Sequence, residues 1–117
     1  MTMLESLFQY LKAGQTLADS RIYPVIGPDK PQSPYVAYQA IFSNSENVLD
    51  GSSGLVNTRV QFDVYSKSYN EARQLFAQID TLMNLWTTKN VSLGSSDGFE
   101  SAVKLYRVSG DYSIWHS

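Results

Sequence analysis

The feature that most constrains this chain is a strict alternation of apolar and polar residues within Leu55–Ser66. The first set is Val56, Thr58, Val60, Phe62 and Val64, and the residues between them are Asn57, Arg59, Gln61 and Asp63. Successive side chains of a β-strand point to opposite faces, so the pattern predicts a strand with one packed face and one polar face. The polar face is expected to meet either water or a polar partner.

Two amphipathic segments are expected to cover the packed face of that sheet. Thr2 and Glu5 form a capping box ahead of an apolar stripe, which predicts a helix over residues 3–13. Ser68 and Glu71 form a second capping box, and the helical period that follows continues for several turns. Both helices are expected on the same face of the sheet.

Shorter β-rich segments complete the predicted sheet. They are 22–26, 35–42, 91–93, 100–108 and 112–115. A turn is expected at the Gly/Ser-rich residues 94–98. A turn or a bulge is expected at 109–111, after which 112–115 either continues the strand or adds a final one. The main order α–β–β–α–β–β predicts an α+β fold, an antiparallel sheet with two helices on one face. Residues 1–117 are expected to form a single domain of this kind.

A polar segment rich in Ser, Asn and Gly, Ser43–Gly54, joins two of these strands. It is typical of a long hairpin connection or a flexible arm. Connections of this length rarely lack structure in a compact domain unless they are functional or disordered. Two interpretations stay open, an arm that binds a partner and a mobile loop without a role.

Composition narrows the possible functions. Nine basic residues are scattered against eleven acidic ones, and the net charge of −2 disfavours direct binding of nucleic acid. The absence of Cys excludes thiolate metal sites and cysteine nucleophiles, and a single histidine with dispersed carboxylates offers no metal-ligand spacing. No apolar run approaches the roughly 20 residues of a membrane helix, and the start does not resemble a signal peptide.

Two serine motifs match enzyme patterns without the context that those enzymes need. Gly94–Gly98 fits Gly-x-Ser-x-Gly, but a strand pattern rather than a helix follows it, which favours a turn. Ser101–Lys104 fits Ser-x-x-Lys, but in the expected strand these two side chains face opposite ways. Asp63 is either a general base or, more simply, the partner of a cross-strand Arg or Lys. We therefore expect no enzyme, cofactor or metal, with a small hydrolase using Ser96 or Asp63 as one alternative.

An ordered set of short motifs resembles one family of phage proteins. The set includes Ile22-Tyr23-Pro24, Pro34-Tyr35-Val36, Leu49-Asp50-Gly51, the run from Arg59 to Ser66, and Ser68-Tyr69. It resembles the tail-completion proteins of phages and prophages, which include tail-to-head joining proteins and are similar in fold to tail terminators. The resemblance implies a structural role, with no catalytic residues and no cofactor.

The resemblance also implies a place in the virion. Members form a ring, usually a hexamer, that caps the head-proximal end of the tail tube, and DNA passes through its hole. The implied partners are further copies of the chain, the tail-tube protein and a head-connector protein, with synthesis in the cytoplasm of the host bacterium and no membrane. A head–tail adaptor, a minor tail subunit and a monomeric binding module are the alternatives.

A ring requires a heterologous interface, in which one patch binds a different patch of the next copy. Sheet edges and a long hairpin arm are suited to this, because unpaired strand edges bind other strands. Trp115, near the end of the last strand, is expected at an edge or an interface. The candidate interface residues are Glu46, Asp50, Asn57, Arg59, Gln61, Asp63 and Trp115.

Overall fold

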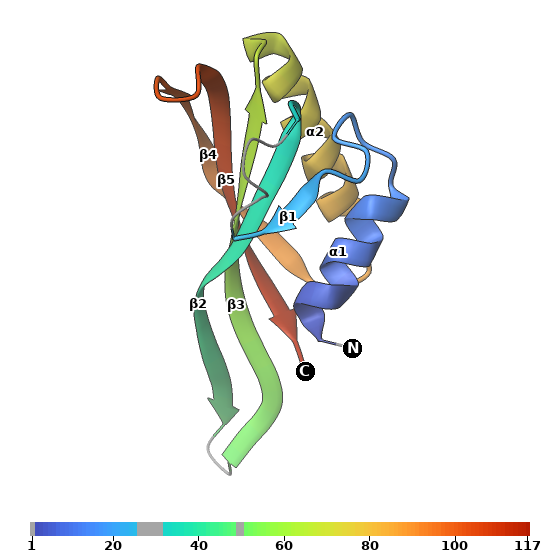
Figure 1. Ribbon diagram of the computed structural model, residues 1–117. Helices are drawn as coiled ribbons and strands as arrows, with labels where there is room; N and C mark the ends of the chain where they lie inside the picture. Colours follow the sequence, from blue (N-terminus) through green and yellow to red (C-terminus); the bar gives the residue numbers. More distant parts are fainter. Residues whose placement is uncertain (1, 26–31, 49–50) are drawn as a thin grey trace.

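The computed structural model describes residues 2–25, 32–48 and 51–117. The elements are α1 (Met3–Ala13), β1 (Ile22–Pro24), β2 (Tyr35–Val48), β3 (Gly51–Ser66), α2 (Tyr69–Leu85), β4 (Asn90–Glu100) and β5 (Leu105–His116). The strands form one five-stranded sheet in the order β1-β2-β3-β5-β4. Both helices lie on the same face of this sheet, and the other face carries no helix (Figure 1). The predicted α+β fold is confirmed.

Both helices begin at the predicted capping residues. The Thr2 hydroxyl accepts a hydrogen bond from the backbone N–H of Glu5 at 3.2 Å, and the Ser68 hydroxyl accepts one from Glu71 at 3.3 Å. Each bond satisfies an N–H group that the first helical turn leaves without a partner. The core lies between the helices and the sheet and includes Leu7, Leu11, Val60, Phe62, Val64, Leu75, Ile79 and Met83.

The sheet is mixed, which corrects the expectation of a purely antiparallel one. β1 pairs with β2 in parallel, with Ile22 opposite Val36 and Pro24 opposite Tyr38. The other three pairs, β2–β3, β3–β5 and β4–β5, are antiparallel as predicted. A parallel neighbour needs a connection that crosses from one end of the sheet to the other. The sequence of residues 22–26 contains no pattern that predicts such a connection, so the direction of β1 could not be predicted from it.

The polar segment 43–54 is not a loop in its described part. β2 and β3 stay paired from Tyr35↔Tyr65 to Val48↔Gly51, with register shifts between Ala40 and Phe42 and near Glu46. Ser and Asn have low β propensity, but the backbone pairing between the two strands overrides that weak preference. Beyond the Val56↔His116 pair, β5 ends, and residues 46–48 and 51–55 form a two-stranded hairpin arm that projects from the body (Figure 1).

The turn expected at 94–98 is wrong, and at 109–111 the strand continues instead of turning. Residues 94–98 lie within β4, where a bulge places Gly94 at φ +112°, and residues 109–111 lie within β5. A Cβ at Gly110 would lie 2.3 Å from the Phe76 ring, so this glycine permits the close approach of α2 rather than a turn. The β4–β5 turn is instead 101–104, which contains the Ser-x-x-Lys motif and Lys104 at φ +56°.

Candidate interface on the open sheet face

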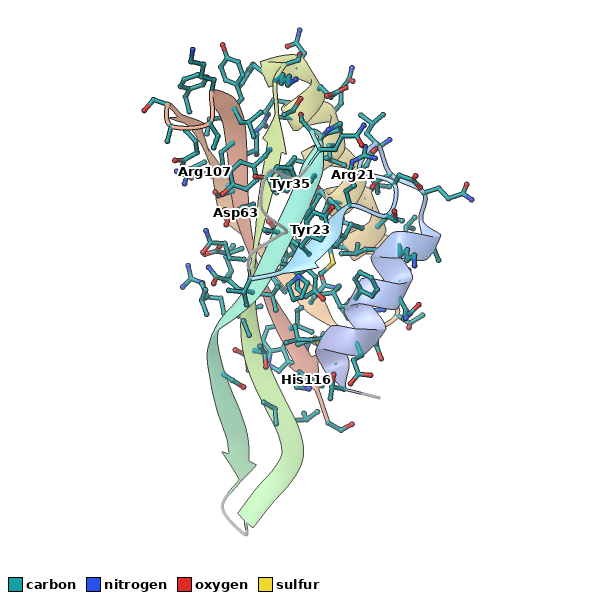
Figure 2. All side chains as sticks on the ribbon, in the orientation of Figure 1. Arg21, Tyr23, Tyr35, Asp63, Arg107 and His116 are labelled. Atoms are coloured by element: carbon teal, nitrogen blue, oxygen red, sulfur yellow. The ribbon has the colours of Figure 1, made fainter. Side chains whose placement is uncertain are left out.

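The side chains of β3 and β5 that point away from the helices form a polar surface. Its cross-strand pairs are Asn57↔Trp115, Arg59↔Ser113, Gln61↔Asp111, Asp63↔Ser109 and Tyr65↔Arg107. We call these ten residues the polar sheet face. Figure 2 shows Asp63 and Arg107 on the side of the sheet away from the helices. Five of the seven predicted interface residues lie on this surface: four on β3, as the alternation in the sequence predicts, and Trp115 on β5.

Hydrogen bonds between β3 and β5 hold the middle of the polar sheet face. The Arg59 guanidinium donates to the Asp111 carboxylate, with Nε 3.0 Å from Oδ2. The Asp63 carboxylate accepts from the Ser109 hydroxyl at 2.5 Å and from the Gln61 amide at 3.1 Å. The expectation that Asp63 pairs with an Arg or Lys is therefore wrong, because Arg59 pairs with Asp111 and Arg107 pairs with Glu100.

A row of three tyrosine rings continues the surface across the neighbouring strands. The Tyr23 and Tyr35 centroids are 6.1 Å apart, and the Tyr35 and Tyr65 centroids are 4.8 Å apart. Arg107 follows next to Tyr65 and forms an ion pair with Glu100 of β4. Burial raises the pKa of the Tyr65 hydroxyl, and the charge of Asp63 raises it further. With Arg107 and Glu100, the row thus runs from β1 to β4.

The remaining predicted interface residues have different surroundings. Trp115 is half-buried, and the Lys89 ammonium lies 5.2 Å from its ring centroid. It is not on an edge strand, because β5 lies between β3 and β4. Glu46 belongs to the hairpin arm, with its backbone opposite Leu55, and Asp50 lies outside the described residues.

The structure does not assemble the hydrolase site that the serine motif would need. Ser96 lies inside β4 opposite Ser109, with no helix after it. His116 contacts the Thr58 hydroxyl at 2.7 Å and is seven residues further along β5 than Ser109. Seven residues of strand span about 23 Å, far beyond the reach of a general base. The described residues also include no group of three or more His, Asp or Glu side chains placed to hold a metal ion.

Neither helix in the described part of the chain is long and apolar enough to span a lipid bilayer.

The β5 half of the surface is not among the interface residues predicted from the sequence. The turn or bulge expected at 109–111 interrupts the strand there and hides the shared face of Arg107, Ser109, Asp111 and Ser113. A signal was present, since Val108, Tyr112 and Ile114 fall on even positions with polar residues between them. All three of these apolar residues are fully buried.

Known proteins match this chain both in sequence and in fold. The family model described as tail completion protein gp17 matches residues 5–117. A chain in a solved structure titled "Virion of native gene transfer agent (GTA) particle" has the same fold, with a TM-score of 0.67 at 13% identity over 93% of this chain and 90% of that one. No curated protein sequence matched. Because the family model spans nearly the whole chain, the protein belongs to the tail completion protein gp17 family and is a structural protein of a phage tail.

Proposed function

We propose that copies of this chain form a ring at the head-proximal end of the tail tube, where they cap the tube and join it to the head. Membership of the tail completion family carries this proposal. The structure supports it through a sheet with one face covered by helices and a second, polar face that is open. In the ring, the helices lie outside and the polar sheet face lines the central hole.

The charges of the polar sheet face suit a hole through which DNA passes. Binding of DNA phosphates needs lysines or arginines that replace condensed counterions. Arg59 is held by Asp111, and Arg107 is held by Glu100. Asp63 adds a further carboxylate beside them. A lining of this kind repels the phosphate backbone or binds it only weakly, so DNA can pass through the hole without being held.

The elongated shape of the subunit supports a role in assembly. The molecule measures 52 × 26 × 24 Å, and the hairpin arm accounts for much of its length (Figure 1). An arm that extends beyond its own body reaches a neighbouring copy, the tail tube or the head connector. In the ring, an arm of this kind is available to contact a neighbouring subunit, which a monomeric binding module would not require.

The test is a phage or prophage deleted for this gene and complemented with variants of the chain. Deletion is expected to leave heads and tails unjoined, with tails of irregular length in electron micrographs. The wild-type chain restores joined particles, whereas Arg59→Ala/Asp63→Ala does not, because both changes alter the polar sheet face.

The double variant should still fold, with a free energy of unfolding within about 2 kcal/mol of wild type, since exposed ion pairs and single hydrogen bonds contribute little. Lys12→Ala, which removes an exposed cation from α1, is the control and is expected to complement fully. Full complementation by the double variant, with normal tail length, would contradict the proposed role of this face.

A further inference from the structure

The two edges of the sheet differ in how they are protected. β1 has only three residues and ends at Pro24, so it offers little backbone for pairing. β4 has eleven residues, is the last strand on the other side, and contains no Pro, Lys or Arg. Short strands, prolines, charged side chains and bulges are the usual means by which proteins prevent edge-to-edge contact. Of these, β4 has one bulge, at 92–94, and two carboxylates, Asp97 and Glu100, each of which is paired with an arginine of its own chain. β4 therefore has the properties of a strand that receives a partner strand.

A second open edge lies on β2. β1 pairs only with Val36–Tyr38, so from Gln39 to Val48 no strand in the described part of the chain lies along the outer side of β2. Each open edge also carries an apolar residue at a bulge. Ile41 on β2 is 41% exposed, and Leu93 on β4 is 50% exposed.

The low stability expected of a two-stranded hairpin arm indicates that a further strand pairs with the edge of β2. A two-stranded hairpin is at best marginally stable in water, and three or more strands are needed for independent stability. Residues 46–48 and 51–55 have only each other as strand partners within the described chain. A third strand laid along β2 removes this weakness, and β4 of another copy is a strand of the required length.

We propose that β4 of one copy pairs with the outer edge of β2, at Gln39–Val48, in the next copy, so that the sheet continues from subunit to subunit. This inference rests on the proposed ring and names its interface. β4 is antiparallel to β5, β5 to β3, and β3 to β2, so β4 and β2 run in opposite directions. If neighbouring copies have the same orientation in the ring, β4 of one copy therefore pairs with β2 of the next as an antiparallel strand. The contact joins two different patches, as ring closure requires, whereas β4 against β4 gives only a two-fold dimer.

The absence of Cys from the chain permits a direct crosslinking test. Two single variants, Ile41→Cys and Leu93→Cys, are treated with a bismaleimide, alone and mixed, under conditions where wild-type protein is oligomeric by analytical ultracentrifugation. Pairing of β4 along the whole of Gln39–Val48 places Leu93 four to five residues from Ile41, so the spacer must reach about 15 Å. Heterologous pairing predicts covalent dimers in the mixture and none in either variant alone. The control mixture, Ile41→Cys with Gln74→Cys on the exposed side of α2, is expected to give none.

The outcomes separate the interface from the ring. An oligomer that gives no crosslink in the mixture, or one in which Leu93→Cys crosslinks to itself, overturns the β4–β2 interface but leaves the ring standing. A strict monomer at all concentrations, even with tail tubes added, overturns both. As a second measurement, Leu93→Lys is expected to lose the oligomer, while Leu85→Lys, at a 72% exposed site on α2, is expected to keep it.

Discussion

At the scale of single residues, Tyr112 is the point where helix and sheet are tied by a polar contact inside the core. Its side chain is fully buried, and its hydroxyl donates a hydrogen bond to the Asp80 carboxylate of α2 at 2.5 Å. Burial raises the pKa of the Tyr112 hydroxyl far above its usual value, and the bond to Asp80 raises it further. The fold therefore holds this proton over the whole physiological range.

This pKa shift has a defined effect on alkaline stability. Tyr112 titrates at about pH 10 in the unfolded chain and higher in the fold, so its contribution is fully present below pH 10 and is lost as the pH rises above it. Tyr112→Phe should lower the free energy of unfolding at pH 7 by about 1 kcal/mol, the worth of one hydrogen bond. It should also flatten the loss of stability between pH 10 and 11, measured by urea unfolding.

Tyr69→Phe provides the comparison, because Tyr69 donates a similar bond to Asp97 from a 42% exposed position. Its effect on both quantities should be clearly smaller, since water competes for an exposed hydrogen bond. An unchanged alkaline slope in Tyr112→Phe would mean that this buried proton does not couple to folding.

At the scale of elements, the local sequence pattern predicts the features that depend only on residues close together in the chain, namely helix caps and strand faces. The caps at Thr2 and Ser68 and the alternation of β3 required no knowledge of the rest of the chain, and all are confirmed. The parallel partner of β1 and the partner of Asp63 depend on how distant strands align, which no local pattern contains. Gly110 favours a turn or a bulge when only the sequence is considered, whereas in the fold it allows the close approach of the Phe76 ring.

The role of Gly110 can be tested by adding a single methyl group. A Cβ at this position would overlap the Phe76 ring of α2, so Gly110→Ala should lower the free energy of unfolding by about 1–3 kcal/mol. Phe76→Leu shortens the clashing group, so Gly110→Ala should lower the free energy of unfolding less in the Phe76→Leu background than in wild type. A double-mutant cycle measured by urea unfolding gives this difference. Gly94→Ala is not a matched control, because its φ of +112° adds backbone strain.

A small effect of Gly110→Ala, below about 0.5 kcal/mol, would be typical of an exposed turn and not of a buried contact. That outcome would favour the turn expected from the sequence over the continuous β5 strand.

At the scale of the whole molecule, three features combine into one account. The helices cover one face of the sheet, the polar sheet face forms the other, and the sheet has two open edges, on β4 and on β2 at Gln39–Val48 (Figure 1). Family membership assigns the chain to the phage tail, and we propose that these features place it in a ring at the end of the tube. The proposed contacts involve neighbouring copies, so the sequence of one copy predicts the polar face but not what binds it.

The most direct measurement adds the purified chain to isolated tail tubes of the phage that encodes it and images the tubes by cryo-electron microscopy. The account predicts a ring of this chain at one end only, and no further growth of that end when tail-tube protein is supplied. Binding along the sides of the tube, at both ends alike, or not at all would contradict it.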